Sequence, residues 1–176
     1  MENEPPDSLY WATSAGGPLI LLEQNLLSSW HGNAGKTPTD YDRACAVKDY
    51  IDVINAGSGK AIVLGEEPAA TSWWPYPEAS GGLFVRWVWA DDDDRVVKAI
   101  KVFSEELWQP ANLNIEVVAG PLVLFDSVCS GSDPDCLRTG CKIQLDLHSG
   151  VYSVSTANYR PNDDTWLIMH RLSLNE

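Results

Sequence analysis

The sequence predicts a strand-dominated α+β fold with mostly antiparallel sheets and one clear amphipathic helix. Short apolar runs recur along the chain between turns rich in Gly, Pro, Asn and Asp, a pattern that is typical of strands. The clear helical spacing of apolar residues falls instead on residues 91–107. No unit of constant length repeats along the chain, which excludes a solenoid or a propeller.

Two pairs of the expected strands are joined by turn sequences. Residues 50–54 and 60–64 flank a Gly-rich turn and are expected to form a hairpin. Residues 142–147 and 151–155 flank His148-Ser149-Gly150, so His148 is expected at a hairpin tip. The expected strands are 18–22, 44–47, 50–54, 60–64, 83–89, 113–118, 120–125, 142–147, 151–155 and 166–172.

The expected helix, at about residues 91–107, begins with consecutive aspartates. Asp91 to Asp94 supply an N-cap and place negative charge at the positive end of the helix dipole. Pro110 marks the end of the segment. The apolar stripe consists of Val96, Ile100, Phe103 and Leu107.

The chain of 176 residues has the length of one ordinary domain. Residues 1–10 are acidic and Pro-rich and are expected to form a flexible tail, so the single α+β domain is expected over residues 11–176. The segments 15–19 and 119–122 share the letters Ala, Gly, Pro and Leu, an echo that leaves two related halves open.

Composition narrows the classes of function. The formal net charge is −13 and no Lys/Arg cluster exists, which disfavours direct binding of nucleic acid and points to a basic partner. Eight Trp, six Tyr and three Phe argue against disorder. No apolar run is long enough for a membrane span, and the acidic start lacks the features of a secretory signal. We therefore expect a cytoplasmic protein that contacts no membrane.

Three of the four cysteines lie in one expected loop, for which free thiols, a metal site and a disulfide are the alternatives. Cys129, Cys136 and Cys141 lie in a segment rich in Ser, Gly and Asp, and His148 could complete a set of four zinc ligands. The gaps between them are wider than the close pairs of structural zinc sites. The spacing therefore favours plain loop thiols over a metal site or a disulfide, and Cys45 is expected to be a small buried residue.

No arrangement of residues indicates catalysis. The sequence lacks a nucleophile elbow, a phosphate-binding loop, a zinc-protease motif and a dinucleotide fingerprint. A base beside a Ser or Cys nucleophile is not indicated for any of the three histidines. We therefore expect a protein that is not an enzyme and that holds no cofactor and no metal.

The remaining candidate residues are charged and aromatic side chains suited to contact with a protein partner. The aspartate run is expected to serve both as a helix start and as an excess of negative charge for a cationic partner. The segment Trp73-Trp74-Pro75-Tyr76-Pro77 is expected to be a proline-stiffened loop, whose rings either cover the sheet or anchor a partner. The candidate contact residues are Glu66, Glu67, Trp73, Trp74, Tyr76, Asp91, Asp92, Asp93 and Asp94.

An ordered series of motifs resembles a known bacterial family, immunity protein 21, which is associated with polymorphic toxin systems. The resemblance extends over residues 11–172 and rests on the order and spacing of the motifs. They are Ser14–Leu22, Trp30–Gly32, Asp40–Cys45, Val63–Pro68 with Thr71 and Trp73, Gly81–Trp87 with Ala90–Asp91, Gly120–Asp126, Tyr159–Pro161 and Asp163–Thr165.

The resemblance implies a protein that binds and neutralises a cognate toxin by stoichiometric contact, and it implies no catalytic residue. An acidic surface suits a toxin with a basic cleft, such as a nuclease. The residues themselves leave two other hypotheses open. One is a small carbohydrate- or peptide-binding module that uses the Trp-rich loop, and the other is a hydrolase with Cys45 or Cys141 as its nucleophile.

Overall fold

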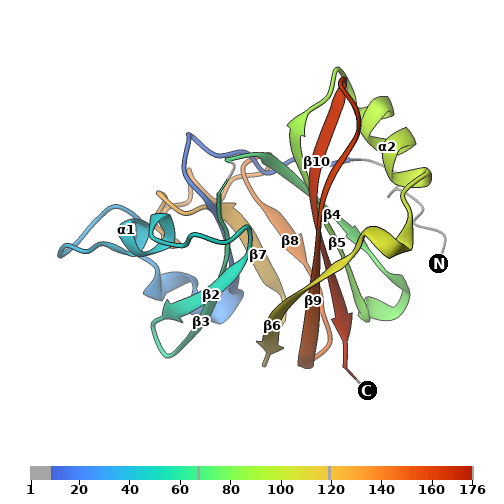
Figure 1. Cartoon of the computed structure of the whole chain (residues 1–176). Helices are drawn as coiled ribbons and strands as arrows, with labels where there is room; N and C mark the ends of the chain where they lie inside the picture. The colour runs from blue at the N-terminus through green and yellow to red at the C-terminus, as the bar shows by residue number, and fades with distance from the viewer. Residues whose placement is uncertain (1–8, 67, 119, 176) are drawn as a thin grey trace.

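A computed structural model describes residues 9–66, 68–118 and 120–175 (Figure 1). In these residues the strands form two five-stranded sheets with antiparallel pairing throughout. The first sheet has the order β2-β3-β1-β7-β8, and the second has the order β4-β5-β10-β9-β6. The expected α+β class with mostly antiparallel sheets is confirmed. None of the described helices is long and apolar enough to cross a membrane.

The strands of each sheet come from distant parts of the chain. The first sheet consists of β1 (Leu19–Glu23), β2 (Asp52–Ala56), β3 (Gly59–Leu64), β7 (Leu122–Asp126) and β8 (Ile143–Leu145). The second consists of β4 (Ala70–Pro75), β5 (Gly81–Trp89), β6 (Gln109–Val117), β9 (Gly150–Asn162) and β10 (Thr165–Leu174). The helices are α1 (Asp40–Cys45) and α2 (Asp93–Lys101), with 3-10 turns η1 (Gln24–Ser29), η2 (Pro77–Ala79) and η3 (Glu105–Leu107).

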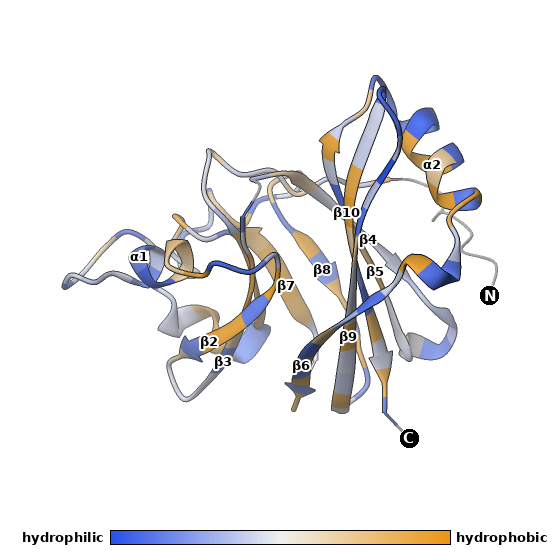
Figure 2. Ribbon diagram, in the orientation of Figure 1, coloured by the Kyte–Doolittle hydropathy of each residue, from blue (hydrophilic) through white to orange (hydrophobic). Residues whose placement is uncertain are grey.

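The two sheets share a buried core. Leu21 and Leu124 of the first sheet belong to one cluster with Phe84 and Tyr152 of the second. Because side chains alternate along a strand, the same strands also supply apolar side chains to the outer faces. Figure 2 shows the hydrophobic residues that run along both sheets.

Helical segments cover the two outer faces. Val96 and Ile100 of α2 pack with Val85 and Met169 on the outer face of the second sheet. On the outer face of the first sheet, a separate cluster contains Ile20, Phe125 and Trp30, together with Leu26 of η1 and Ala44 of α1. The strands β1 and β7 are therefore buried on both faces, which explains their continuous apolar runs.

The expected hairpin of residues 50–54 and 60–64 is confirmed as β2 and β3, which close at the pair Ala56↔Gly59. The two segments that echo each other precede neighbouring strands of the first sheet. The carbonyl of Pro18 accepts from the amide of Ser127 at 3.2 Å, and that of Pro121 accepts from the amide of Gln24 at 2.9 Å. The proposed tail falls mostly on residues 1–8, which lie outside the described residues.

The expected strand at residues 44–47 is wrong, because Ala44 and Cys45 are the last residues of the helix α1 and the two residues after them form no strand. Thr39 is its N-cap, with a side chain that accepts from the amide of Asp42 at 3.1 Å. The Asp42 carboxylate accepts in return from the amide of Thr39 at 2.8 Å. This capping box satisfies two backbone donors at the helix start, and it decides the local structure against a short apolar run.

The expected helix at residues 91–107 is shorter, because α2 ends at Lys101. Phe103 lies beyond the helix, where its ring makes edge-on contacts with Trp108 and Tyr159 at centroid distances of 5.0 Å each. Leu107 belongs to the separate turn η3 and is exposed. The aromatic contacts hold the end of the apolar stripe outside helical geometry.

The expected hairpin around His148 is also wrong. β8 ends at Leu145 in the first sheet, and β9 begins at Gly150 in the second. Residues 146–149 therefore connect the two sheets, and the carbonyl of His148 accepts from the hydroxyl of Tyr152 at 2.8 Å. A turn sequence signals a change of direction, but it does not specify which strand is the next partner.

Candidate functional site

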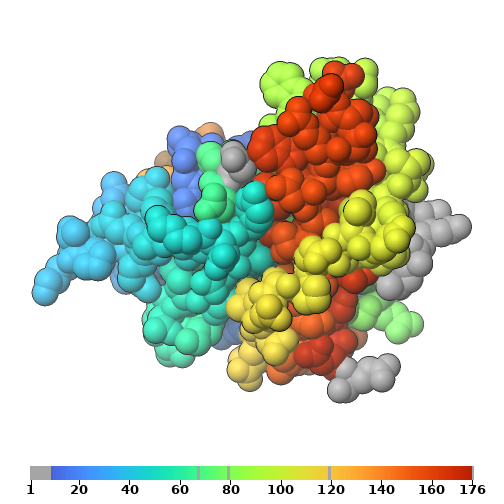
Figure 3. Space-filling model, viewed as in Figure 1, coloured from blue at the N-terminus to red at the C-terminus, as the bar shows by residue number. Residues whose placement is uncertain are grey.

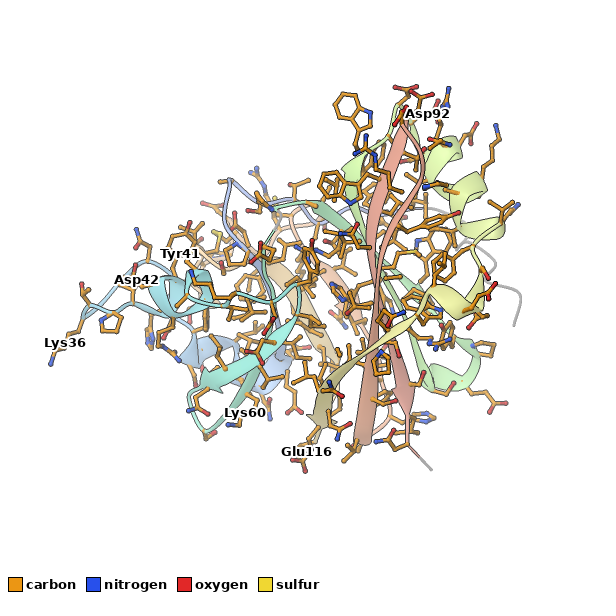
Figure 4. All side chains as sticks on the ribbon, in the orientation of Figure 1. Lys36, Tyr41, Asp42, Lys60, Asp92 and Glu116 are labelled. Atoms are coloured by element: carbon orange, nitrogen blue, oxygen red, sulfur yellow. A yellow bond between two sulfur atoms is a disulfide. The ribbon has the colours of Figure 1, made fainter. Side chains whose placement is uncertain are left out.

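The aspartate run lies between β5 and α2 at one end of the second sheet. Asp91 to Asp94 are all exposed. The Asp92 carboxylate caps α2 by accepting from the amide of Arg95 at 2.9 Å. The Asp93 carboxylate accepts from the indole Nε1 of Trp11 at 3.1 Å. Figure 4 shows Asp92 at the outer end of the sheet. The expected helix start at these aspartates is confirmed.

The β9–β10 turn brings two further carboxylates to the same end. Arg95 of α2 lies 3.4 Å from the Asp91 carboxylate and 3.7 Å from that of Asp164. The Arg160 guanidinium lies 3.6 Å from the Asp163 carboxylate. We call Asp91 to Asp94, Asp163 and Asp164 the acidic tip. Its two parts are some 70 residues apart in the chain (Asp94 and Asp164), so sequence reasoning did not join them.

An exposed ring and a hollow adjoin the acidic tip. Trp89, at the end of β5, is 59% exposed and lies opposite Trp166 of β10. A hollow of about 540 Å³ opens between α2 and the β9–β10 turn, and Val102, which is 74% exposed, lines it. The hollow is lined by Asp92, Asp94, Arg95, Lys98, Ala99, Val102, Pro161, Asn162 and Thr165. The position of Trp89 in an alternating strand does not predict that its ring is exposed.

The expected Trp-rich loop is wrong, because Trp73 and Trp74 lie in the strand β4. Trp73 is 8% exposed and packs on Phe84 at a centroid distance of 4.6 Å in the core between the sheets. Trp74 is 2% exposed and belongs to the cluster on the opposite face of the second sheet. The alternation of a strand thus buries one ring on each face. Pro75 is tolerated because β4 is the terminal strand of its sheet and ends there.

Tyr76 is half-buried just after β4. Burial raises the pKa of its phenol to about 12, with the Arg171 guanidinium lowering it and the Glu105 carboxylate raising it. Arg171 and Glu105 form an ion pair at 2.6 Å, and the Arg171 guanidinium lies 4.8 Å from the ring centroid of Trp108. Tyr76 is therefore a neutral side chain beside the Arg171–Glu105 ion pair. It is not one of the residues that line the hollow between α2 and the β9–β10 turn.

Glu66 is exposed in the loop after β3, where it adopts a φ of 60°. It lines a different hollow, of about 270 Å³, together with Cys45 and Lys48. Glu67 lies outside the described residues. Glu66 and the aspartate run therefore contribute to two separate surface features.

A buried polar pair that the sequence analysis missed joins the two sheets. Arg86 of β5 donates from its guanidinium to the carbonyl of Tyr50 at 2.8 Å and to that of Gly65 at 2.5 Å. The same guanidinium lies 3.4 Å from Nε2 of His170, whose Nδ1 lies 2.8 Å from the hydroxyl of Thr156. Burial, and then the Arg86 charge, hold the pKa of His170 well below its usual range.

The cysteine loop contains a disulfide between Cys129 and Cys136, where plain thiols had been expected. Cys141 is half-buried and accepts from the Nε of Arg138 at 3.4 Å, whereas Cys45 is exposed rather than buried as expected. Among the described residues no group of three or more His, Cys, Asp or Glu side chains is placed to hold a metal ion.

Of the comparisons with known proteins, the one with family models finds a match. The family model of immunity protein 21 matches residues 10–165. No curated protein and no solved structure matches the chain at a significant level. The matched range covers most of the 176 residues and contains the acidic tip, Trp89 and the buried pair of Arg86 and His170. The chain therefore belongs to the immunity protein 21 family.

Proposed function

We propose that this chain neutralises a cognate toxin of a polymorphic toxin system by occupying it stoichiometrically, in the cytoplasm. Family membership gives the general role of an immunity protein. The observation that carries the proposal further is the acidic tip, whose six exposed carboxylates lie at the end of the second sheet where β5 ends with the exposed ring of Trp89. Carboxylates steer a basic partner toward the surface, and a large exposed ring supplies an anchor once contact is made.

Among the candidate contact residues, the exposed aspartates fit the proposal best. The Arg95 and Arg160 ion pairs at the acidic tip involve exposed groups, so they leave much of the negative charge available to a partner. Glu66 stays in the proposal as a separate exposed carboxylate. Trp73 and Trp74 are left out because their rings are buried.

The alternative of a carbohydrate-binding module is not supported by a specific observation. Stacking on a sugar requires an exposed ring face, and the two adjacent tryptophans that suggested it pack inside the core. Trp89 is exposed, but the aspartates that follow it in the chain suit a cationic partner.

The test is co-expression with the toxic domain that is encoded beside this chain's gene. We expect the wild-type chain to restore growth and to co-purify with the toxic domain in a 1:1 complex. Trp89→Ala combined with Asp94→Lys should weaken the complex by at least about tenfold, because it removes an anchor and reverses a charge.

Asp146→Lys is the matched control for the charge reversal, because Asp146 is exposed and lies away from the acidic tip. This variant should bind as the wild-type chain does. A wild-type chain that neither binds nor protects against the toxic domain would overturn the proposal. Equal loss of binding in both variants would show that overall charge, and not the acidic tip, governs the contact.

A further inference from the structure

Each sheet has a terminal strand on the same side of the molecule. β2 ends the first sheet with β3 as its strand partner, and β6 ends the second with β9 as its partner. Figure 1 shows both strands at the front of the molecule with their arrows toward the same side. An edge strand offers backbone donors and acceptors to an additional strand, so the structure presents a natural place for one.

Two hollows lie between these two strands, one at each end. A hollow of about 470 Å³ is lined by residues 49–52, at the start of β2, and by residues 109–113, at the start of β6. A second, of about 410 Å³, is lined by the β2–β3 turn and by Glu116 and Val118 at the end of β6. Figure 3 shows β6 beside the segment that leads into β2, and Figure 4 shows Lys60 and Glu116 at the far end. We call this feature the β2–β6 furrow.

The inner wall of the β2–β6 furrow is apolar. Val53, Ala111 and Leu113 are half-buried and pack against the core between the sheets. Val118, which is 66% exposed, extends the apolar surface at the far end. A partner segment with alternating apolar side chains would bury this surface.

The charges around the furrow are mainly negative. The lining residues include four carboxylates, Asp49, Asp52, Glu23 and Glu116, and one cation, Lys60. The Lys60 ammonium donates to the side-chain carbonyl of Asn55 at 2.6 Å. The charge is therefore complementary to a segment that carries lysine or arginine.

The two edges differ in how accessible their backbone is. On β2, the Asp52 carboxylate accepts from the amide of Val53 at 2.7 Å, and Arg43 donates to the carbonyl of Asn55 at 2.6 Å. Side chains thus protect the edge of β2 against pairing. On β6, the pairing with β9 is irregular between Pro110 and Asn114 but regular from Asn114 to Val117, so this regular part is the edge to which a strand can add. Just beyond it, the Glu23 carboxylate accepts from the amide of Val118 at 2.6 Å.

We propose that the β2–β6 furrow receives an extended, arginine- or lysine-rich segment of a protein partner, which adds to the edge of β6. The main chain of the segment pairs with β6, alternate apolar side chains cover Val53 and Leu113, and the basic side chains reach Asp49 and Glu116 at the two ends. That the partner is a toxin rests on the proposed function. The furrow lies apart from the residues that form the acidic tip, so the chain would hold its partner at two places.

A peptide probe tests the furrow without knowledge of the toxin. The probe is a fluorescein-labelled ten-residue peptide in which arginine alternates with valine, and its binding to the full chain is measured by fluorescence anisotropy. We expect it to bind at least about tenfold more tightly than the same peptide with glutamate in place of arginine. Of two versions that are N-methylated at alternate amides, one should lose binding by a similar factor, because one set of amides faces β6. If both methylated versions bind as tightly as the parent peptide, strand addition is wrong.

Variants of the chain locate the binding. Asp49 and Glu116 are exposed, so Asp49→Lys with Glu116→Lys should leave the urea midpoint unchanged within error and weaken the arginine peptide by at least about tenfold. Asp135→Lys with Asp146→Lys changes the net charge equally at exposed residues outside both the furrow and the acidic tip, and it should alter the affinity by less than about twofold. Equal effects of the two double variants would reduce the interaction to overall charge and overturn the proposal.

Two further measurements separate this inference from its alternatives. If the toxic domain binds the wild-type chain and the Asp49/Glu116 variant equally well, the furrow proposal fails while the proposed function stands. If no toxic domain binds but the peptide behaves as expected, the proposed function fails and the furrow remains a peptide-binding edge. A dimer in light scattering that the Asp49/Glu116 variant abolishes would identify a second copy of the chain as the occupant and overturn the proposal.

Discussion

Arg86 is a charged side chain with 1% exposure, and its position explains how the two sheets are joined. Its strand belongs to the second sheet, but its guanidinium donates to the carbonyls of Tyr50 and Gly65, which flank β2 and β3 of the first. Buried main-chain carbonyls need such donors, because an unmade hydrogen bond in the interior is costly. The sequence Val85-Arg86-Trp87 gave no sign of this role, because the acceptors come from distant segments.

Replacing Arg86 should therefore destabilise the whole fold. Arg86→Met leaves the carbonyl of the buried Gly65 without this donor and removes one of the two donors to the carbonyl of Tyr50. It also leaves His170 without its charged neighbour. Together these losses should lower the free energy of unfolding by roughly 3–5 kcal/mol. Arg86→Lys retains the charge but not the forked geometry, so it should lose less than the Met variant. Urea unfolding measures both. A loss below about 1 kcal/mol for Arg86→Met would contradict the role of Arg86 as a tie between the sheets.

His170 should make stability depend on pH between about 7 and 5. The pKa of His170 is lowered in the folded chain by burial and by Arg86, whereas the unfolded value is about 6.5. Below that value the unfolded chain takes up a proton that the folded chain does not, so stability falls as the pH falls. The slope should approach about 1.4 kcal/mol per pH unit, until the pH reaches the folded pKa.

His170→Gln is the control for this effect. Glutamine keeps a polar group near Thr156 and Arg86 but does not titrate, so its unfolding free energy should vary less between pH 7 and 5 than that of the wild-type chain. Urea unfolding across this range compares the two chains. Parallel curves would show that other groups produce the dependence.

At the scale of elements, short polar signals decided structure where apolar runs did not. The capping box of Thr39 and Asp42 sets α1 in a segment whose run Ala44-Cys45-Ala46-Val47 had predicted a strand. In α2, the aspartates correctly marked the start, but the apolar spacing continued past the real end at Lys101. Phe103 continues the helical spacing in the sequence, but it lies beyond the helix, where its ring contacts Trp108 and Tyr159.

The Asp92 cap should contribute measurably to α2. Asp92→Ala removes the acceptor for the amide of Arg95 and should lower the free energy of unfolding by about 1 kcal/mol. Asp92→Asn keeps an acceptor oxygen and should lower the free energy of unfolding by no more than a few tenths of a kcal/mol. Thermal or urea unfolding distinguishes the two variants. If they are equally destabilised, the carboxylate acts through its charge on the helix dipole rather than through the cap.

At the scale of the whole molecule, the formal net charge of −13 should control how fast the partner arrives. The association rate with the toxic domain should fall by about an order of magnitude or more between about 0.01 M and 0.5 M salt, because salt screens the steering field. The dissociation rate should change much less, since packed contacts such as those of Trp89 resist screening. Stopped-flow fluorescence gives both rates. An association rate that stays constant across this range would rule out steering.

The sequence by itself determined the features that depend on neighbours in the chain. The buried strand at residues 18–22, the β2–β3 hairpin, the start of α2, the strongly acidic composition and the motifs of the immunity protein 21 family all follow from local patterns. A local pattern fixes turns, caps and alternation, because these arise from groups a few residues apart.

Only the tertiary structure decided which of these elements meet. It placed Asp163 and Asp164 beside the aspartate run, buried Trp73 and Trp74 on opposite faces of one strand, and left β2 and β6 as terminal strands on a common furrow. It also separated β8 from β9, although a turn sequence joins them. Strand order and exposure are set by pairing between distant segments, and a single sequence contains no signal for that pairing beyond the apolar character the strands share.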